Sequence, residues 1–132
     1  MSGHIVSGLG VASNLLHLQL PLLRGFLPDI ENYKIGTINV QLDHAPDIKI
    51  PDIVTPPLQW EPSSNVGERF GFTSVKLELF EKQHDAWIYG AEFSSHRFNY
   101  TVVELIARPI NGIAAGLPCT LYLERFTGYI VV

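Results

Sequence analysis

Apolar and polar residues alternate with a period of two in several separate segments of this chain. Between positions 37 and 42 the apolar set is Ile38, Val40 and Leu42, and the polar set is Thr37, Asn39 and Gln41. Similar alternation occurs within 70–80, 87–93 and 119–124. A period of two places each set on one face of an extended backbone, which is typical of half-buried strands. Many strands with short turns and little helix predict a mainly β protein, a small closed or nearly closed β-barrel with one or two short helices.

Prolines and turn residues divide the expected strands. Five prolines fall within 43–62, which predicts a long surface excursion holding at most a short edge strand. Residues 83–85 are expected to form the turn between two long strands. The segment 101–107 fits either a strand or a short helix, and 22–27 is expected to form one or two helical turns. A further short strand is expected at 16–20, where leucines alternate with polar residues.

Length, charge and cysteine content limit the class of protein. The 132 residues predict one domain over 1–132. A formal net charge of −4 argues against nucleic-acid binding, because nucleic-acid binders need a basic surface. The single cysteine, Cys119, forms no internal disulfide and is expected to be buried, so we expect a cytoplasmic location. No signal peptide or membrane span is expected, since the apolar stretch 15–27 is short and interrupted by polar residues.

A glycine turn follows the first expected strand. Gly8 and Gly10 flank Leu9, and glycines at such a turn let a phosphate approach the backbone N–H groups. The segment therefore indicates either a phosphate-binding loop or an ordinary turn at the end of a strand.

A second polar pair lies on the alternating segment 36–40. Thr37 and Asn39 are two residues apart, so their side-chain oxygens face the same side of a strand. Oxygen ligands of this kind suit Mg²⁺ when a nucleotide supplies the negative charge. The alternative is a polar strand face in contact with solvent.

The order of these segments resembles the archaeal-type CTP-dependent riboflavin kinases. The resemblance rests on Ser7-Gly8-Leu9-Gly10, on Gly36-Thr37-Ile38-Asn39-Val40-Gln41-Leu42-Asp43, and on Val102-Val103-Glu104-Leu105-Ile106-Ala107. It implies a small six-stranded-type cradle-loop barrel that transfers the γ-phosphate of CTP to riboflavin with Mg²⁺, giving FMN. A nucleotide and a flavin would then be the ligands.

The resemblance also implies roles for individual residues. Gly8, Leu9 and Gly10 would bind the nucleotide, and Thr37 and Asn39 would hold Mg²⁺. Glu104 would bind the flavin and act as the catalytic carboxylate that orients the attacking hydroxyl. His96 aligns with a hydroxyl residue of the family upstream of its glutamate, which implies a flavin-binding role.

Two alternatives remain open from the sequence. The family continues its glycine loop with charged residues, whereas this chain has Val11-Ala12-Ser13, and the segment after Ala107 is shortened around 110–115. These differences favour a non-catalytic barrel that binds a flavin or a nucleotide. The apolar tail 129–132 favours an exposed edge that pairs with a partner chain, for example in a homodimer.

Overall fold

The computed structural model describes residues 1–6, 23–26, 38–46, 52–59, 67, 69–91, 101–124 and 130–131. Within them eight strands belong to one sheet. Their bounds are β1 Ser2–Val6, β2 Ile38–Leu42, β3 Ile53–Val54, β4 Phe70–Leu79, β5 Lys82–Ala91, β6 Val102–Ala107, β7 Pro118–Leu123 and β8 Ile130–Val131.

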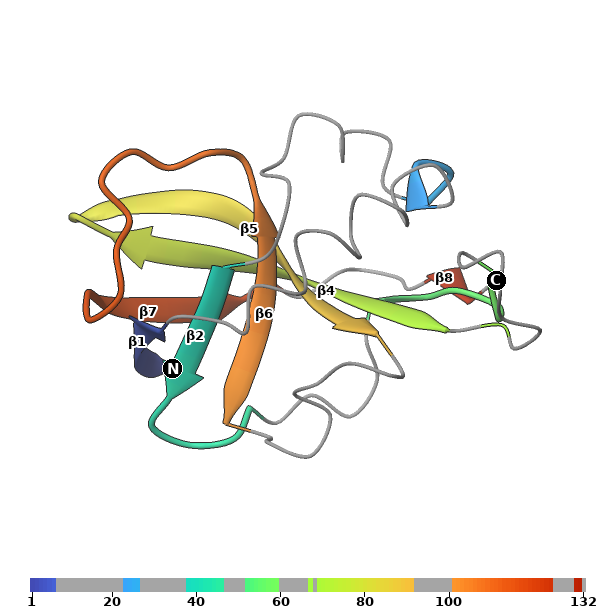
Figure 1. Cartoon of the computed structure of the whole chain (residues 1–132), viewed down its shortest axis with the longest axis horizontal. Helices are drawn as coiled ribbons and strands as arrows, with labels where there is room; N and C mark the ends of the chain where they lie inside the picture. The colour runs from blue at the N-terminus through green and yellow to red at the C-terminus, as the bar shows by residue number, and fades with distance from the viewer. Residues whose placement is uncertain are drawn as a thin grey trace.

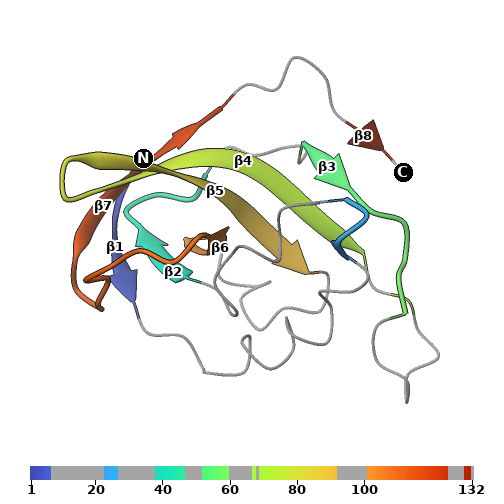
Figure 2. The same cartoon turned by 90° about the horizontal axis from the view of Figure 1, so that it is seen from above.

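Six of these strands close into an antiparallel barrel, which confirms the predicted fold class (Figure 1). The ring runs from β5 through β6, β2, β1, β7 and β4, and the β4–β5 hairpin closes it. Both β4 and β5 have ten residues, longer than the other strands, so the hairpin continues past the ring. There β3 pairs with the start of β4, and β8 lies parallel to β3 (Figure 2).

The barrel interior is filled by the apolar set of each alternating strand. Val40 and Leu77 are fully buried there, and the inward side of β2 carries the three apolar residues that the sequence predicts. The interior cluster contains Ile5, Ile38, Val40, Leu42, Val75, Leu77, Leu79, Ala86, Val103, Leu105, Ala107, Cys119 and Leu121. Cys119 is buried among these side chains, as expected, and burial raises the pKa of its thiol to about 11.

A second apolar cluster covers part of the outer face of the barrel. It contains Leu23, Ile53, Phe70, Phe72, Tyr89 and Ile106, with Phe26, Leu58 and Trp87 packed against it. Strand β6 is consequently buried on both faces, Leu105 toward the interior and Ile106 toward this outer layer. Burial on both faces explains why 101–107 lacks a clear alternation in the sequence.

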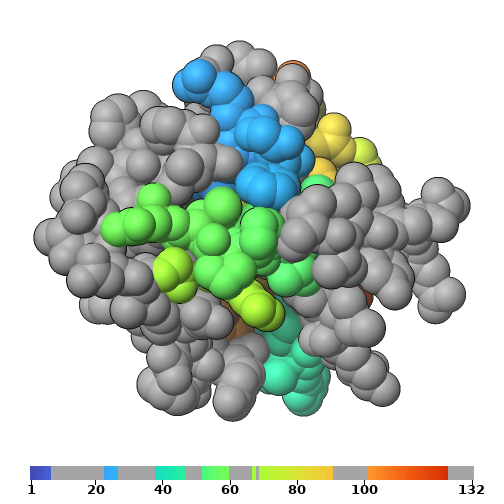
Figure 3. Space-filling model, turned by 90° about the vertical axis from the view of Figure 1, so that its right-hand side faces the viewer, coloured from blue at the N-terminus to red at the C-terminus, as the bar shows by residue number. Residues whose placement is uncertain are grey.

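The turn Leu23–Phe26 forms part of this outer layer. The Phe26 N–H donates to the Leu23 carbonyl at 2.9 Å, and Leu23 is completely buried. This is the described part of the helical turn expected at 22–27. Figure 3 shows the turn beside the segment 52–59, on the face that the outer cluster occupies.

The turn between β4 and β5 lies at Phe80–Glu81, so the prediction of a turn at 83–85 is wrong. Leu79 pairs directly with Lys82, which leaves a two-residue loop with φ of 53° at Phe80 and 61° at Glu81. The polar residues 83–85 instead continue β5, and Lys76 on β4 forms an ion pair with Asp85. The sequence signal failed because neither turn residue is one of those that normally adopt a positive φ.

Replacing Phe80 and Glu81 together by Asn and Gly is expected to stabilise the protein by about 1–2 kcal/mol, because Asn-Gly adopts this turn without strain. The Phe80 side chain is 54% exposed, so little packing is lost. Urea denaturation of the double variant measures the change. A fall in the free energy of unfolding would contradict the assignment of strain to this turn.

Other sequence predictions have mixed outcomes. The described part of the excursion at 43–62 contains one short strand, as expected, but this strand, β3, pairs on both sides and is not an edge. Within the tail, Ile130 and Val131 pair with β3 of the same chain. The turn at Asn111–Gly112 is confirmed, with a φ of 77° at Gly112. The strand expected at 16–20 lies outside the described residues.

Candidate functional site

Asn39 and Glu104 are direct partners across two neighbouring strands. The register of β2 with β6 pairs Asn39 with Glu104, between the pairs Ile38–Leu105 and Val40–Val103. Since residues directly opposite in a sheet share a face, both polar side chains lie on the outer face, away from the barrel interior. Two residues that are far apart in the sequence therefore form one polar pair.

Both members of this pair are buried beneath the outer layer. Asn39 is 7% exposed and Glu104 is 6% exposed. On its other side Glu104 is paired with Tyr89 of β5, and the next outward residue of its own strand is Ile106. Glu104 thus has an aromatic and an apolar neighbour on two sides, and its direct partner on β2 is polar.

Tyr89 is held by aromatic contacts on β4. Its ring stacks on Phe70, with centroids 6.0 Å apart and planes 22° apart, and it meets Phe72 at 5.9 Å in a tilted arrangement. Trp87 packs partly buried beside the same cluster. The wall next to Glu104 is therefore a fixed group of aromatic side chains, and apolar surroundings strengthen any electrostatic contact made there.

The Asn39 side chain has an unused hydrogen-bond acceptor. Its Oδ1 is buried and has no hydrogen-bond partner in the part of the chain that the structure describes. Leaving a buried acceptor unpaired costs about 1–3 kcal/mol. Such a group calls for an explanation, and a ligand that supplies a cation or a donor would satisfy it.

The donor set of the pair fits a hard cation. An amide oxygen and a carboxylate are oxygen ligands of the kind that Mg²⁺ and Ca²⁺ prefer. The orphaned Oδ1 of Asn39 and the carboxylate opposite it supply this chemistry from two rigid strands. Thr37, the second predicted Mg²⁺ ligand, lies outside the described residues.

The predicted site residues are thus placed only in part. Asn39 and Glu104 are described, and the structure brings them together as partners. Gly8, Leu9 and Gly10, predicted for the nucleotide, lie outside the described residues, as does His96, predicted for the flavin. Sequence reasoning did not identify Tyr89 as a neighbour of Glu104, because only the pairing of β5 with β6 makes them adjacent.

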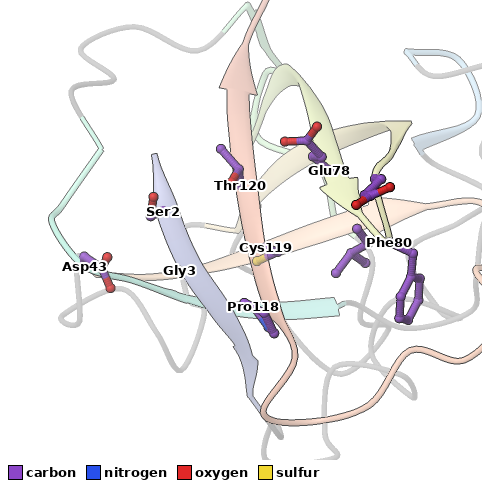
Figure 4. A pocket seen from close by; sticks show the side chains of 10 residues that line it. Ser2, Gly3, Asp43, Glu78, Phe80, Pro118, Cys119 and Thr120 are labelled. Carbon is purple, nitrogen blue, oxygen red and sulfur yellow. The ribbon is translucent and has the colours of Figure 1, made fainter.

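A separate groove of about 570 Å³ lies at the end of the barrel near the β4–β5 turn. Figure 4 shows Thr120 of β7 between Ser2 of β1 and Glu78 of β4, and Asp43 and Phe80 line the groove further out. Neither Asn39 nor Glu104 lines it. The groove is therefore distinct from the buried polar pair.

The described acidic, histidine and cysteine side chains offer no grouped set of metal ligands. Asp43 and His44 are exposed just after β2. Across the described ranges, no three His, Cys, Asp or Glu side chains are grouped to hold a metal ion. None of the described segments forms a helix with the length and apolar character needed to cross a membrane.

In comparisons with known proteins, no protein-family model matches this chain and no curated protein is similar enough to count as a match.

Proposed function

We propose that this protein is a riboflavin kinase-like phosphotransferase that uses a nucleoside triphosphate, CTP by the resemblance, and Mg²⁺ to convert riboflavin to FMN. One observation carries the proposal: among the described residues the buried Asn39 Oδ1 has no hydrogen-bond partner, and Asn39 lies directly opposite Glu104. These are two of the residues that the resemblance assigns to the reaction. A cytoplasmic location belongs to the same proposal.

Asn39, together with Thr37, would hold the Mg²⁺ ion. When bound, Mg²⁺ would neutralise negative charge on the nucleotide phosphates, which is most of what a phosphoryl transfer requires from a protein. Asn39 supplies a neutral oxygen from the interior of a five-residue strand, so its position is fixed by the β1 and β6 strands on either side.

Glu104 would accept a hydrogen bond from the hydroxyl of the acceptor and orient it toward the γ-phosphate. The buried outer layer around it, with Tyr89 and Ile106, keeps water from competing with that hydroxyl. As the hydroxyl oxygen bonds to the γ-phosphorus, its proton would pass to the Glu104 carboxylate, the bond from the γ-phosphorus to the bridging oxygen would break, and the nucleoside diphosphate would leave. The glycine turn and His96 enter the proposal through the resemblance alone.

A non-catalytic flavin- or nucleotide-binding barrel is the second candidate. The chain carries no charged residue from Pro109 to Leu117, and it has Val11-Ala12-Ser13 after the glycine turn. Both segments lack the charged contacts to a nucleotide that the family resemblance leads one to expect. Binding without turnover would follow.

The test is FMN formation. Incubating the protein with riboflavin, Mg²⁺ and each of the four nucleoside triphosphates is expected to yield FMN with at least one of them, detected by chromatography with fluorescence. Glu104→Gln is expected to lower the rate at least about 100-fold, since a positioned proton acceptor contributes about 10²–10⁴. No FMN with any of the four, from a protein that still binds riboflavin, would favour the second candidate.

A further inference from the structure

We propose that Asn111 is a site of spontaneous chemical modification in the folded protein, where its side-chain amide is lost to give aspartate and isoaspartate. Asn111 and Gly112 form an exposed turn in the loop that joins β6 to β7. The inference is independent of the proposed function, because it concerns neither Asn39 nor Glu104.

The residue after Asn111 leaves its backbone nitrogen open to reaction. Gly112 has a φ of 77°, and the atoms nearest to the position of an added Cβ belong to the Phe80 ring, at 3.7 and 3.8 Å. Among the described backbone hydrogen bonds outside the strands, none engages the Gly112 N–H. The nitrogen therefore belongs to a residue without a side chain, in a turn exposed to water, and no such bond has to break before it reacts.

The following residue sets Asn111 apart from the other asparagines. The chain has six asparagines, and only Asn111 is followed by glycine. The others precede leucine, tyrosine or valine, whose side chains hinder attack on the amide. Asn39 is the opposite case, since it is buried in the interior of β2 and precedes the β-branched Val40. Asn111 is therefore expected to react in the native protein before any of the others.

The reaction needs only water as a co-reactant. The Gly112 nitrogen loses its proton and bonds to the carbonyl carbon of the Asn111 side chain, the bond from that carbon to the amide nitrogen breaks, and ammonia leaves with the proton. A cyclic succinimide remains. Water then opens either carbonyl–nitrogen bond of the ring, which gives aspartate with the original main chain or isoaspartate, whose main chain runs through the former side chain. No group is oxidised or reduced, and each event adds one negative charge.

The two products are expected to differ in stability because of the residues that flank the turn. Ile110 and Ile113 are partly buried and pack against the interior cluster of the barrel. Isoaspartate lengthens the main chain between these two side chains by one carbon, so a close-packed core cannot keep both in place without a shift. Aspartate leaves the main chain unchanged.

The experiment is incubation of the full chain in mildly alkaline buffer well below its melting temperature, followed by proteolytic digestion and mass spectrometry. The peptide with Asn111 is expected to gain the mass difference between an amide and a carboxylic acid, and to accept methyl groups from protein isoaspartate methyltransferase. The peptide with Asn39 is the matched control and is expected to stay unmodified. Asn111→Gln is expected to abolish both signals, because its longer side chain closes a larger ring much more slowly.

Protein denatured in guanidinium chloride and incubated in the same buffer tests whether the fold permits the reaction. Modification of Asn111 in both the native and the denatured sample would support the inference. Modification in the denatured sample alone, or native modification spread equally over the asparagines, would overturn it.

Anion-exchange chromatography then separates the modified protein by its added charge. The isoaspartate fraction is expected to melt at a lower temperature than the unmodified protein, whereas Asn111→Asp is expected to melt close to it. An isoaspartate fraction that melts together with Asn111→Asp would overturn the link to the packing of Ile110 and Ile113.

Discussion

Replacing Asn39 with leucine is expected to stabilise the ligand-free protein by about 1–2 kcal/mol and to abolish its Mg²⁺-dependent binding of nucleotide. The buried Oδ1 of Asn39 has no partner among the described residues, so an apolar side chain of similar size removes a desolvation cost. The same change removes a ligand of the proposed cation site. Urea denaturation measures the first effect, and calorimetric titration with CTP, with and without Mg²⁺, measures the second.

Gln41→Leu is the control on the same strand and the same face. The Gln41 Nε2 donates to Thr101 Oγ1 at 2.6 Å and to the Leu42 carbonyl at 3.1 Å. Losing these bonds is expected to destabilise the protein by about 1 kcal/mol. Should Asn39→Leu destabilise the protein as much as Gln41→Leu does, Asn39 would be a structural residue and not a ligand-binding one.

Leu105→Ala is expected to lower the free energy of unfolding by about 2–5 kcal/mol, since it leaves a cavity in the barrel interior. Leu105 is completely buried, pairs with Ile38 on one side and Ile88 on the other, and belongs to the interior cluster. Its sequence neighbour Glu104 points to the opposite face. Denaturant unfolding of Leu105→Ala and of Glu104→Gln therefore separates the two faces of β6.

For function the order of the two variants is expected to reverse, with the larger loss in Glu104→Gln. Glu104→Gln retains the shape of the side chain and is expected to unfold close to the wild type while losing the proposed activity. Leu105→Ala, assayed well below its melting temperature, is expected to retain nucleotide binding. Comparable loss of stability in both variants would mean that Glu104 is a structural member of the barrel.

The sequence predicted individual strands of the barrel correctly where one face of the strand is buried and the other is not. Alternation identified β2 and the stretch Val75–Leu79 of β4 correctly, because period two reports directly on a one-sided strand. It did not decide β6, which is buried on both faces. It also misplaced the β4–β5 turn, since Phe80 and Glu81 adopt positive φ values without the usual turn residues.

The sequence pointed to individual residues of the candidate site, but not to how these residues lie relative to one another. Residue type and the family resemblance singled out Asn39, and the resemblance alone singled out Glu104. That they face each other depends on the register between β2 and β6, and a one-residue slip would turn either side chain to the other face. Register between distant strands is set by packing of the whole barrel, which local patterns do not contain. For the same reason the sequence did not place Tyr89 beside Glu104.

The most direct test of the account is a crystal structure of the protein grown with Mn²⁺ and a non-hydrolysable CTP analogue, with anomalous data collected at the manganese edge. The account predicts one anomalous peak next to the Asn39 Oδ1, with the analogue's phosphates beside it. A structure in which the nucleotide and the ion bind elsewhere, with the Asn39 Oδ1 satisfied by a protein group, would contradict it.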